Sequence, residues 1–226
     1  MNTVSPKPLR LRASGPLACF TRPELKAERV SYQVMTPSAA RGILEAVLWK
    51  PAIRWRIERI KVLKPIRWVA FRRNEVNSRA SPPAAKVIAS GGAPPFLLAD
   101  EDRAQRNTVA LADVDYIIEA RFDMTDRAGP DDNRAKFVEM FRRRVERGQH
   151  YHQPYLGCRE FVAHIEAVNG DAPAPINETC DLGMMLYDIA YGQESNRPIF
   201  FAARLVDGVL EVPADEGVLR QKGGAP

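Results

Sequence analysis

The side chains best suited to proton transfer are three histidines, His150, His152 and His164. Imidazole titrates near neutral pH, so histidine can act as a general acid or base. His150 and His152 would face the same side of an extended segment, which is the spacing of a metal pair or a proton shuttle. No third ligand is evident nearby, and the sequence has no nucleophile elbow, phosphate-binding loop, dinucleotide fingerprint or HExxH motif. The pattern therefore disfavours a metallohydrolase and a nucleotide-driven enzyme.

The three cysteines, Cys19, Cys158 and Cys180, are odd in number and widely spaced. They provide neither a disulfide framework nor a zinc knuckle. The sequence also has no run of about 18 apolar residues and no apolar signal core near its start. We therefore expect a cytoplasmic protein that uses no metal, no cofactor and no membrane.

Positive charge is concentrated in the first third of the chain. Residues 1–75 carry 16 Lys/Arg and 5 Asp/Glu, a net charge of +11, whereas residues 76–147 are neutral and residues 148–226 carry −6. Such asymmetry indicates a polyanionic partner for the basic part. The alternative is that this part merely has a solvated basic face.

Aromatic residues are interleaved with the cations of this basic part. Arginine forks suit phosphates and aromatic faces suit unstacked bases, which single-stranded RNA offers together. Trp55 and Trp68 could either stack on bases or lie in the core. We expect both to lie in the core, because each is in the apolar phase of a predicted strand. The expected RNA-binding residues of this part are Phe20, Arg22, Lys26, Arg29, Arg41, Lys50, Arg72 and Arg73.

Two helices are expected to position these residues. Thr36 and Pro37 form an N-cap with proline at the first helical position, and Pro51 stops the helix. Its apolar stripe consists of Ala40, Ile43, Leu44, Val47 and Leu48. The second helix follows residues 130–132 and ends near Gly148, with an apolar stripe of Phe137, Met140, Phe141 and Val145.

The second helix also carries cations along one side of its apolar stripe. Lys136, Arg143 and Arg147 lie there, and Arg142 and Arg144 extend the basic surface. Such a run is usually a solvated helix face, and its meaning changes only if RNA lies alongside. On that condition Arg143 and Arg147 are further RNA-binding candidates.

Alternating apolar residues predict the strands. They occur at residues 9–13, at 53–62 with a bulge where the phase flips, at 114–124 and at 161–165. Residues 74–99 predict a long loop or protruding hairpin. The order is the βαββαβ pattern of a ferredoxin-like α+β domain with two helices on one face, shared with the RNA-recognition motif.

The C-terminal part predicts a small antiparallel β-sheet appended to this domain. Residues 199–205 and 209–212 flank Asp207-Gly208, a strong hairpin signal, and residues 184–189 suggest another strand beside it. We expect a first domain over residues 1–155 with a flexible insertion around 74–99. Residues 156–226 would add its final strand and the small sheet.

Several long stretches match one known family in order. They include MTPSAARGILEA at residues 35–46 and HQPYLGCREF at residues 152–161; the others are residues 20–24, 28–32, 49–55, 64–67, 72–76 and 105–108. The chain thereby resembles the CRISPR-associated Cas-five family in its subtype I-C branch. The matching stretches add Asn74 and Arg106 to the expected RNA-binding residues.

This resemblance implies a fold of the RAMP (RRM/RAMP) type, ferredoxin-like with an inserted hairpin and a small C-terminal sheet. It implies binding of the CRISPR RNA 5′ handle and repeat stem-loop, assembly with backbone and large subunits, and indirect contact with target DNA. In subtype I-C it also implies metal-independent cleavage of the precursor RNA, in which a ribose 2′-hydroxyl attacks the adjacent phosphate and leaves a cyclic phosphate.

The catalytic positions of the family are only partly retained. The resemblance places a tyrosine at the end of the first helix and a Lys-His pair on the second, where this chain has Leu48, Lys136 and Phe137. Leucine and phenylalanine cannot transfer protons. Either His152, His150 or Tyr32 supplies the acid–base step while Lys136 stabilises the phosphorane, or this member binds the RNA handle without cutting.

Overall fold

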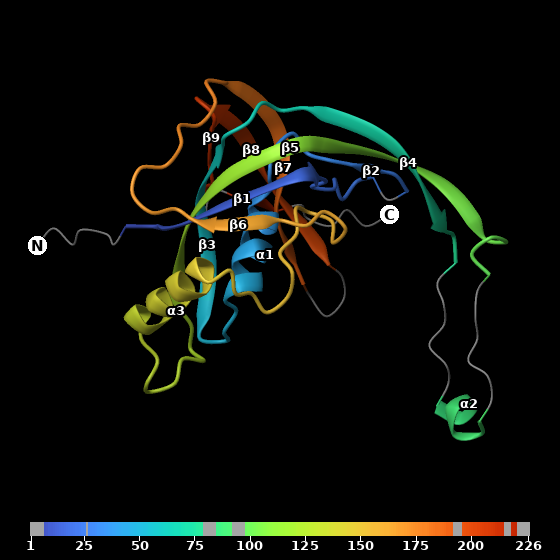
Figure 1. The fold of residues 1–226 in the computed structure, drawn as a ribbon, viewed down its shortest axis with the longest axis horizontal. Coiled ribbons are helices and arrows are strands. Elements are labelled where there is room, and N and C mark those ends of the chain that lie inside the picture. Colours follow the sequence, from blue (N-terminus) through green and yellow to red (C-terminus); the bar gives the residue numbers. More distant parts are fainter. Residues whose placement is uncertain are drawn as a thin grey trace, which may run out of the picture.

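The computed structural model describes residues 7–25, 27–78, 85–91, 98–191, 196–214 and 218–220. In this part of the chain, strands far apart in sequence form a ten-stranded, mostly antiparallel sheet, with α1 and α3 packed beside it (Figure 1). The strands are β1 (Leu9–Ala18), β2 (Arg29–Val30), β3 (Ile53–Val62), β4 (Trp68–Val76), β5 (Arg103–Met124), β6 (His164–Ala167), β7 (Cys180–Ala190), β8 (Arg197–Val206), β9 (Val209–Glu211) and β10 (Leu219–Arg220). The helices are α1 (Pro37–Val47), α2 (Ala85–Ala89) and α3 (Arg134–Glu146).

The first long helix begins and ends where its sequence predicts. The Thr36 hydroxyl accepts a hydrogen bond from the Ala39 N–H at 3.3 Å, and proline occupies the first turn. The helix ends at Val47, where the Leu48 N–H still bonds the Leu44 carbonyl at 2.8 Å. Its apolar stripe is buried against the sheet. The predicted N-cap and apolar face are confirmed.

The second long helix is also confirmed. The Asn133 side chain caps α3 by accepting a hydrogen bond from the Lys136 N–H at 2.9 Å, and Gly148 adopts φ 61° just after the helix. Phe137, Phe141 and Val145 are its buried residues.

The sheet is organised around β5, which spans 22 residues. Its second half pairs antiparallel with β1 on one side and β3 on the other, and β6 pairs antiparallel with β1, giving the order β3-β5-β1-β6. The apolar residues of this half that face the helices contribute Tyr116 and Phe122 to the core. Trp55 of β3 lies between Phe122 and Phe141, with ring centroids 5.4 and 5.0 Å away. The α+β prediction is confirmed, as is the bulge in β3, where the register shifts between Ile57 and Arg59.

The first half of β5 pairs with β4 and runs away from α1 and α3 (Figure 1). Residues 74–76 lie in β4 and β5 begins at Arg103, so these strands form the arms of the hairpin predicted over 74–99. Residues 79–84 and 92–97 of that prediction lie outside the described residues. The prediction that Trp68 is a core residue is wrong, because 48% of this residue is exposed on β4.

The C-terminal strands are antiparallel and continue the main sheet. Asp207 and Gly208 form the predicted turn between β8 and β9, with φ 47° and 71°. β7 pairs with β8, while β9 pairs with β3 and thereby joins the C-terminal strands to the central ones. Among the described residues, the helices are all too short or too polar to cross a bilayer.

Candidate functional site

The C-terminal end of α1 is held by groups from three other segments. The Ala46 carbonyl accepts a hydrogen bond from the Tyr151 N–H at 2.7 Å. The Val47 carbonyl accepts one from Arg144 of α3 at 2.7 Å, and the Leu48 carbonyl one from the Trp55 indole at 2.9 Å. The last carbonyls of a helix have no partner within it, so these bonds satisfy them and fix the loop after α3 against α1. We call Trp49, Lys50, Asp132, Lys136, Tyr151 and His152, which lie around this junction, the helix-end cluster.

Two lysines of the helix-end cluster act on one carboxylate. Lys136 Nζ lies 3.0 Å from Asp132 Oδ1. The pKa of Asp132 is lowered by this hydrogen bond, by the Gly129 N–H, and by the charge of Lys50. Lys136 and Lys50 together carry one positive charge more than Asp132 offsets, and the Lys136 side chain is 44% exposed. This charge suits a phosphate.

The other two family positions are buried beneath this surface. Leu48 is 0% exposed and Phe137 1% exposed. Phe137 packs edge-on against Phe122, with ring centroids 6.3 Å apart. Their predicted places on the apolar stripes are confirmed, so Lys136 is the only one of the three positions that can act on an RNA.

The histidines considered for proton transfer lie in the loop after α3. His150 and His152 are both exposed, and His152 Nδ1 lies 3.3 Å from the Gln153 carbonyl oxygen. Burial raises the pKa of Glu45, and the charges of Arg41 and His152 oppose that rise. In the described part of the chain, no hydrogen bond or ion pair joins His152 to Lys136.

Tyr32, the third candidate for proton transfer, is placed in the core. It is 1% exposed, burial raises the pKa of its hydroxyl, and the Arg22 guanidinium lies 4.5 Å from the centre of its ring. The structure therefore does not bring Tyr32 together with Lys136 or His152 at an open surface.

Several of the predicted RNA-binding cations already have acidic partners. Arg29 contacts Glu160 at 2.5 Å and Glu75 at 3.2 Å, and Arg73 binds the same two carboxylates. Arg41 of α1 makes a two-bond contact with Asp188 of β7. These arginines join distant segments of the fold, and the acidic groups offset their charge.

The remaining predicted residues differ in exposure. Phe20 is buried against Tyr116, with ring centroids 6.0 Å apart, so its ring faces the core. Asn74 is exposed on β4, and Arg106 of β5 donates a hydrogen bond to Asn77 Oδ1 at 3.3 Å. Lys26 lies outside the described residues.

The predicted cations most open to a polyanion lie on two elements. Arg143 and Arg147 are exposed at the C-terminal end of α3, and Arg72 is exposed on β4. Within the described ranges, none of these three side chains forms an ion pair or a hydrogen bond. Arg22 has a 3.4 Å contact with Glu24.

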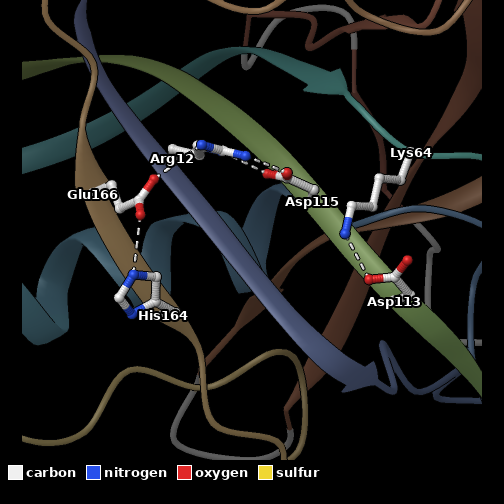
Figure 2. A network of polar contacts seen from close by, with 6 residues as sticks. All are labelled: Arg12, Lys64, Asp113, Asp115, His164 and Glu166. Carbon is white, nitrogen blue, oxygen red and sulfur yellow. Dashed lines mark hydrogen bonds and ion pairs between the residues drawn. The ribbon is translucent and has the colours of Figure 1, made fainter.

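The sheet face opposite the helices carries charges that are paired with one another. Arg12 donates two hydrogen bonds to Asp115, at 3.0 and 2.7 Å, and a third to Glu166, which also contacts His164 (Figure 2). Lys64 contacts Asp113 at 2.6 Å on the same strand as Asp115. Arg59 and Lys61 of β3 both contact the buried Glu119 of β5. The net charge of +11 over residues 1–75 therefore overstates the charge that is free to bind RNA.

One cleft lies apart from the predicted site residues. Its volume is about 740 Å³, and Arg10, Arg59, Glu119, Arg142 and Glu146 are among its lining residues. The described residues contain no group of three His, Cys, Asp or Glu side chains able to hold a metal ion.

Comparison with known proteins identifies a family. Residues 8–213 match the family model described as CRISPR-associated protein (Cas_Cas5). The chain is 47% identical over 215 residues to "CRISPR pre-crRNA endoribonuclease Cas5d" of Mannheimia succiniciproducens, covering 91% of this chain and 94% of that one. It is 42% identical over 227 residues to the protein of the same name from Thermus thermophilus, covering 92% of each.

Solved structures share the fold at lower identity. A crystal structure of a CRISPR-associated protein aligns with a TM-score of 0.67 at 21% identity, covering 92% of each chain. A chain of a CRISPR RNA-guided surveillance complex aligns with a TM-score of 0.50 at 16% identity, covering 95% of this chain and 91% of that one. The matching family model and the two close relatives show that this chain belongs to the CRISPR-associated Cas5 family, in the Cas5d group that fits subtype I-C.

Proposed function

We propose that this protein binds CRISPR RNA and cuts its precursor as a metal-independent endoribonuclease of subtype I-C. Two relatives that cover more than nine-tenths of the chain carry the name pre-crRNA endoribonuclease. The observation that carries the proposal is the helix-end cluster, where Lys136 lies at an open, positively charged surface beside Lys50.

The proposed reaction breaks one phosphodiester bond without an added nucleophile. The 2′-hydroxyl of a ribose loses its proton and attacks the adjacent phosphorus, the 5′-oxygen leaves with a proton, and a cyclic phosphate remains. Lys136 and Lys50 stabilise the extra negative charge of the phosphorane. His152 is the proposed proton carrier, because it is exposed and belongs to the same junction.

The proposed RNA path runs from the helix-end cluster over the open cations. Arg143 of α3 and its C-cap residue Arg147 follow Lys136 along the helix, and Arg72 continues the path on β4, one of the hairpin arms. Arg29, Arg41 and Arg73 support this surface through their ion pairs. The protein remains in a surveillance complex, with backbone and large subunits as partners, and contacts target DNA indirectly.

The finer architecture is part of the same proposal. The antiparallel order β3-β5-β1-β6, with α1 and α3 in the crossovers, supports a ferredoxin-like domain over residues 1–155. Residues 156–226 add its last strand and the C-terminal strands. Free thiols at all three cysteines support a cytoplasmic location.

A second candidate function is RNA binding without cleavage, favoured by the burial of Leu48 and Phe137. Incubating the chain with labelled repeat stem-loop RNA in EDTA separates the two. Cleavage that persists in EDTA and stops when the scissile ribose lacks its 2′-hydroxyl supports the enzyme. RNA that is bound tightly but left intact supports the binding subunit, and RNA that is not bound refutes both.

A further inference from the structure

Two aromatic rings at the end of α1 are open to solvent although the backbone of Tyr151 and of the residues flanking Trp49 is held by hydrogen bonds. Trp49 is 62% exposed and Tyr151 is 90% exposed, whereas Trp55 nearby is 4% exposed. Trp49 follows the last residues of α1, and the Tyr151 N–H bonds the Ala46 carbonyl in the last turn of that helix. Both residues therefore belong to one junction, where the end of α1 meets the loop after α3.

Such exposure is costly unless a ligand covers the rings. A large aromatic side chain left in water forgoes the stabilisation that burial gives it. Neither ring packs into the core; the only ring contact of Tyr151 among the described residues is with His152, at 6.2 Å between centroids. Because the backbone around these rings is already held, less conformational entropy is lost when a flat ligand stacks on them.

The surroundings favour a nucleobase over a protein surface. Lys50 follows Trp49 directly in the sequence. Lys50 and Lys136 both interact with the Asp132 carboxylate. Among the described residues, the exposed large apolar side chains within residues 46–51 and 148–155 are Trp49 and Tyr151, so no exposed aliphatic side chain accompanies them in these segments. Protein interfaces combine aromatic with aliphatic residues and are depleted in lysine, whereas single-stranded RNA sites combine aromatic platforms with cations.

We infer that Trp49 and Tyr151 stack on unpaired bases of the repeat RNA and hold the nucleotides that flank the scissile phosphate beside Lys50 and Lys136. This inference rests on the proposed function. The stacking contact tolerates any base, so it sets the position of the RNA strand at the lysines. Trp49 and Tyr151 are positioning residues, since the role assigned to them is ring stacking and the Tyr151 hydroxyl takes no part in it.

The test measures the Kd of the full chain for an uncleavable repeat RNA that lacks the scissile 2′-hydroxyl. Trp49→Ala and Tyr151→Ala should each weaken binding about 5- to 150-fold, the range for losing one stacked base. Trp49→Phe and Tyr151→Phe, which keep a ring, should recover most of that loss. Tyr191→Ala removes an aromatic residue of similar exposure, 76%, just after β7, and should leave the Kd unchanged.

A second RNA series carries a single abasic nucleotide at successive positions around the scission site. When the abasic nucleotide is at the stacked position, the wild-type chain should bind this RNA more weakly than intact RNA. The alanine variant, which has already lost the stacking contact, should bind both RNAs equally. Alanine variants that bind like the wild type overturn the inference alone, as does a loss that is the same on every abasic RNA. Variants that bind RNA normally but fail to assemble with other subunits would identify a protein interface instead. A wild-type chain that binds no repeat RNA overturns both this inference and the proposed function.

Discussion

Replacing Lys136 by alanine should slow cleavage while leaving RNA binding nearly unchanged. A cation about 4 Å from the phosphorane gains roughly 4 kcal/mol at an effective dielectric constant of 20. The Lys136 side chain is 44% exposed and Asp132 lies 3.0 Å from its Nζ, so we expect about half of that gain. A loss of about 2 kcal/mol corresponds to a rate roughly 30-fold lower.

The assay is single-turnover cleavage of labelled repeat RNA in EDTA, with the Kd measured in parallel on uncleavable RNA. Lys136→Arg keeps the charge and should retain most of the rate. Arg204→Ala removes a positive charge from β8, outside the helix-end cluster, and serves as the matched control. The reasoning is refuted if Lys136→Ala cleaves at the wild-type rate, or if it slows cleavage no more than Arg204→Ala does.

Three further predictions concern the fold and one thiol. Arg12→Ala leaves the 4% exposed Asp115 without its two-bond partner and should lower the free energy of unfolding in urea by about 2–3 kcal/mol; adding Asp115→Ala should recover part of this, and an unchanged single variant contradicts it. Gly157 has φ 85°, and a Cβ at this position would lie 2.1 Å from the carbonyl oxygen of Cys19, just after β1. Gly157→Ala should therefore lower the thermal midpoint of unfolding by several degrees, and an unaltered midpoint would show that the loop can shift freely. A hydrogen bond with the buried thiol of Cys19 lowers the pKa of Cys158, whereas burial raises the pKa of Cys180. Because the thiolate is the reactive form, Cys158 should be alkylated faster than Cys180 at neutral pH in a mass-spectrometric peptide assay, and equal rates would disprove the shift.

Local signals in the sequence were sufficient to predict the helices and the C-terminal turn. Thr36 and Gly148 mark helix ends through their own side-chain or backbone chemistry, and Asp207-Gly208 specifies its turn in the same way. The bulge in β3 follows from a phase change within a single strand. Each of these features is encoded by neighbouring residues, so no tertiary contact is needed to infer it.

Features that depend on distant partners were harder to predict. The first half of β5 is polar and forms a strand because β4 pairs with it. Trp68 shows an apolar phase, but it lies on the exposed side of β4, alternating with the partly buried Val69 and Phe71. The ion pairs of Arg29 and Arg73 with Glu160 join residues 131 and 87 positions apart, so counting charges along the chain could not show that these cations are already paired.

The central position of β5 has a consequence for how the chain folds during synthesis. β1 is made first, yet its partner residues in β5 lie roughly 100 positions later, as in the pairing of Leu9 with Ala120. At about 5–20 residues per second, the ribosome needs roughly 5–20 seconds to supply that partner. Throughout that interval the alternating apolar residues of β1 are exposed beside the emerging α1 and β3. We therefore expect this protein to depend most on chaperones during synthesis, when its N-terminal third has been made and the partner residues in β5 have not.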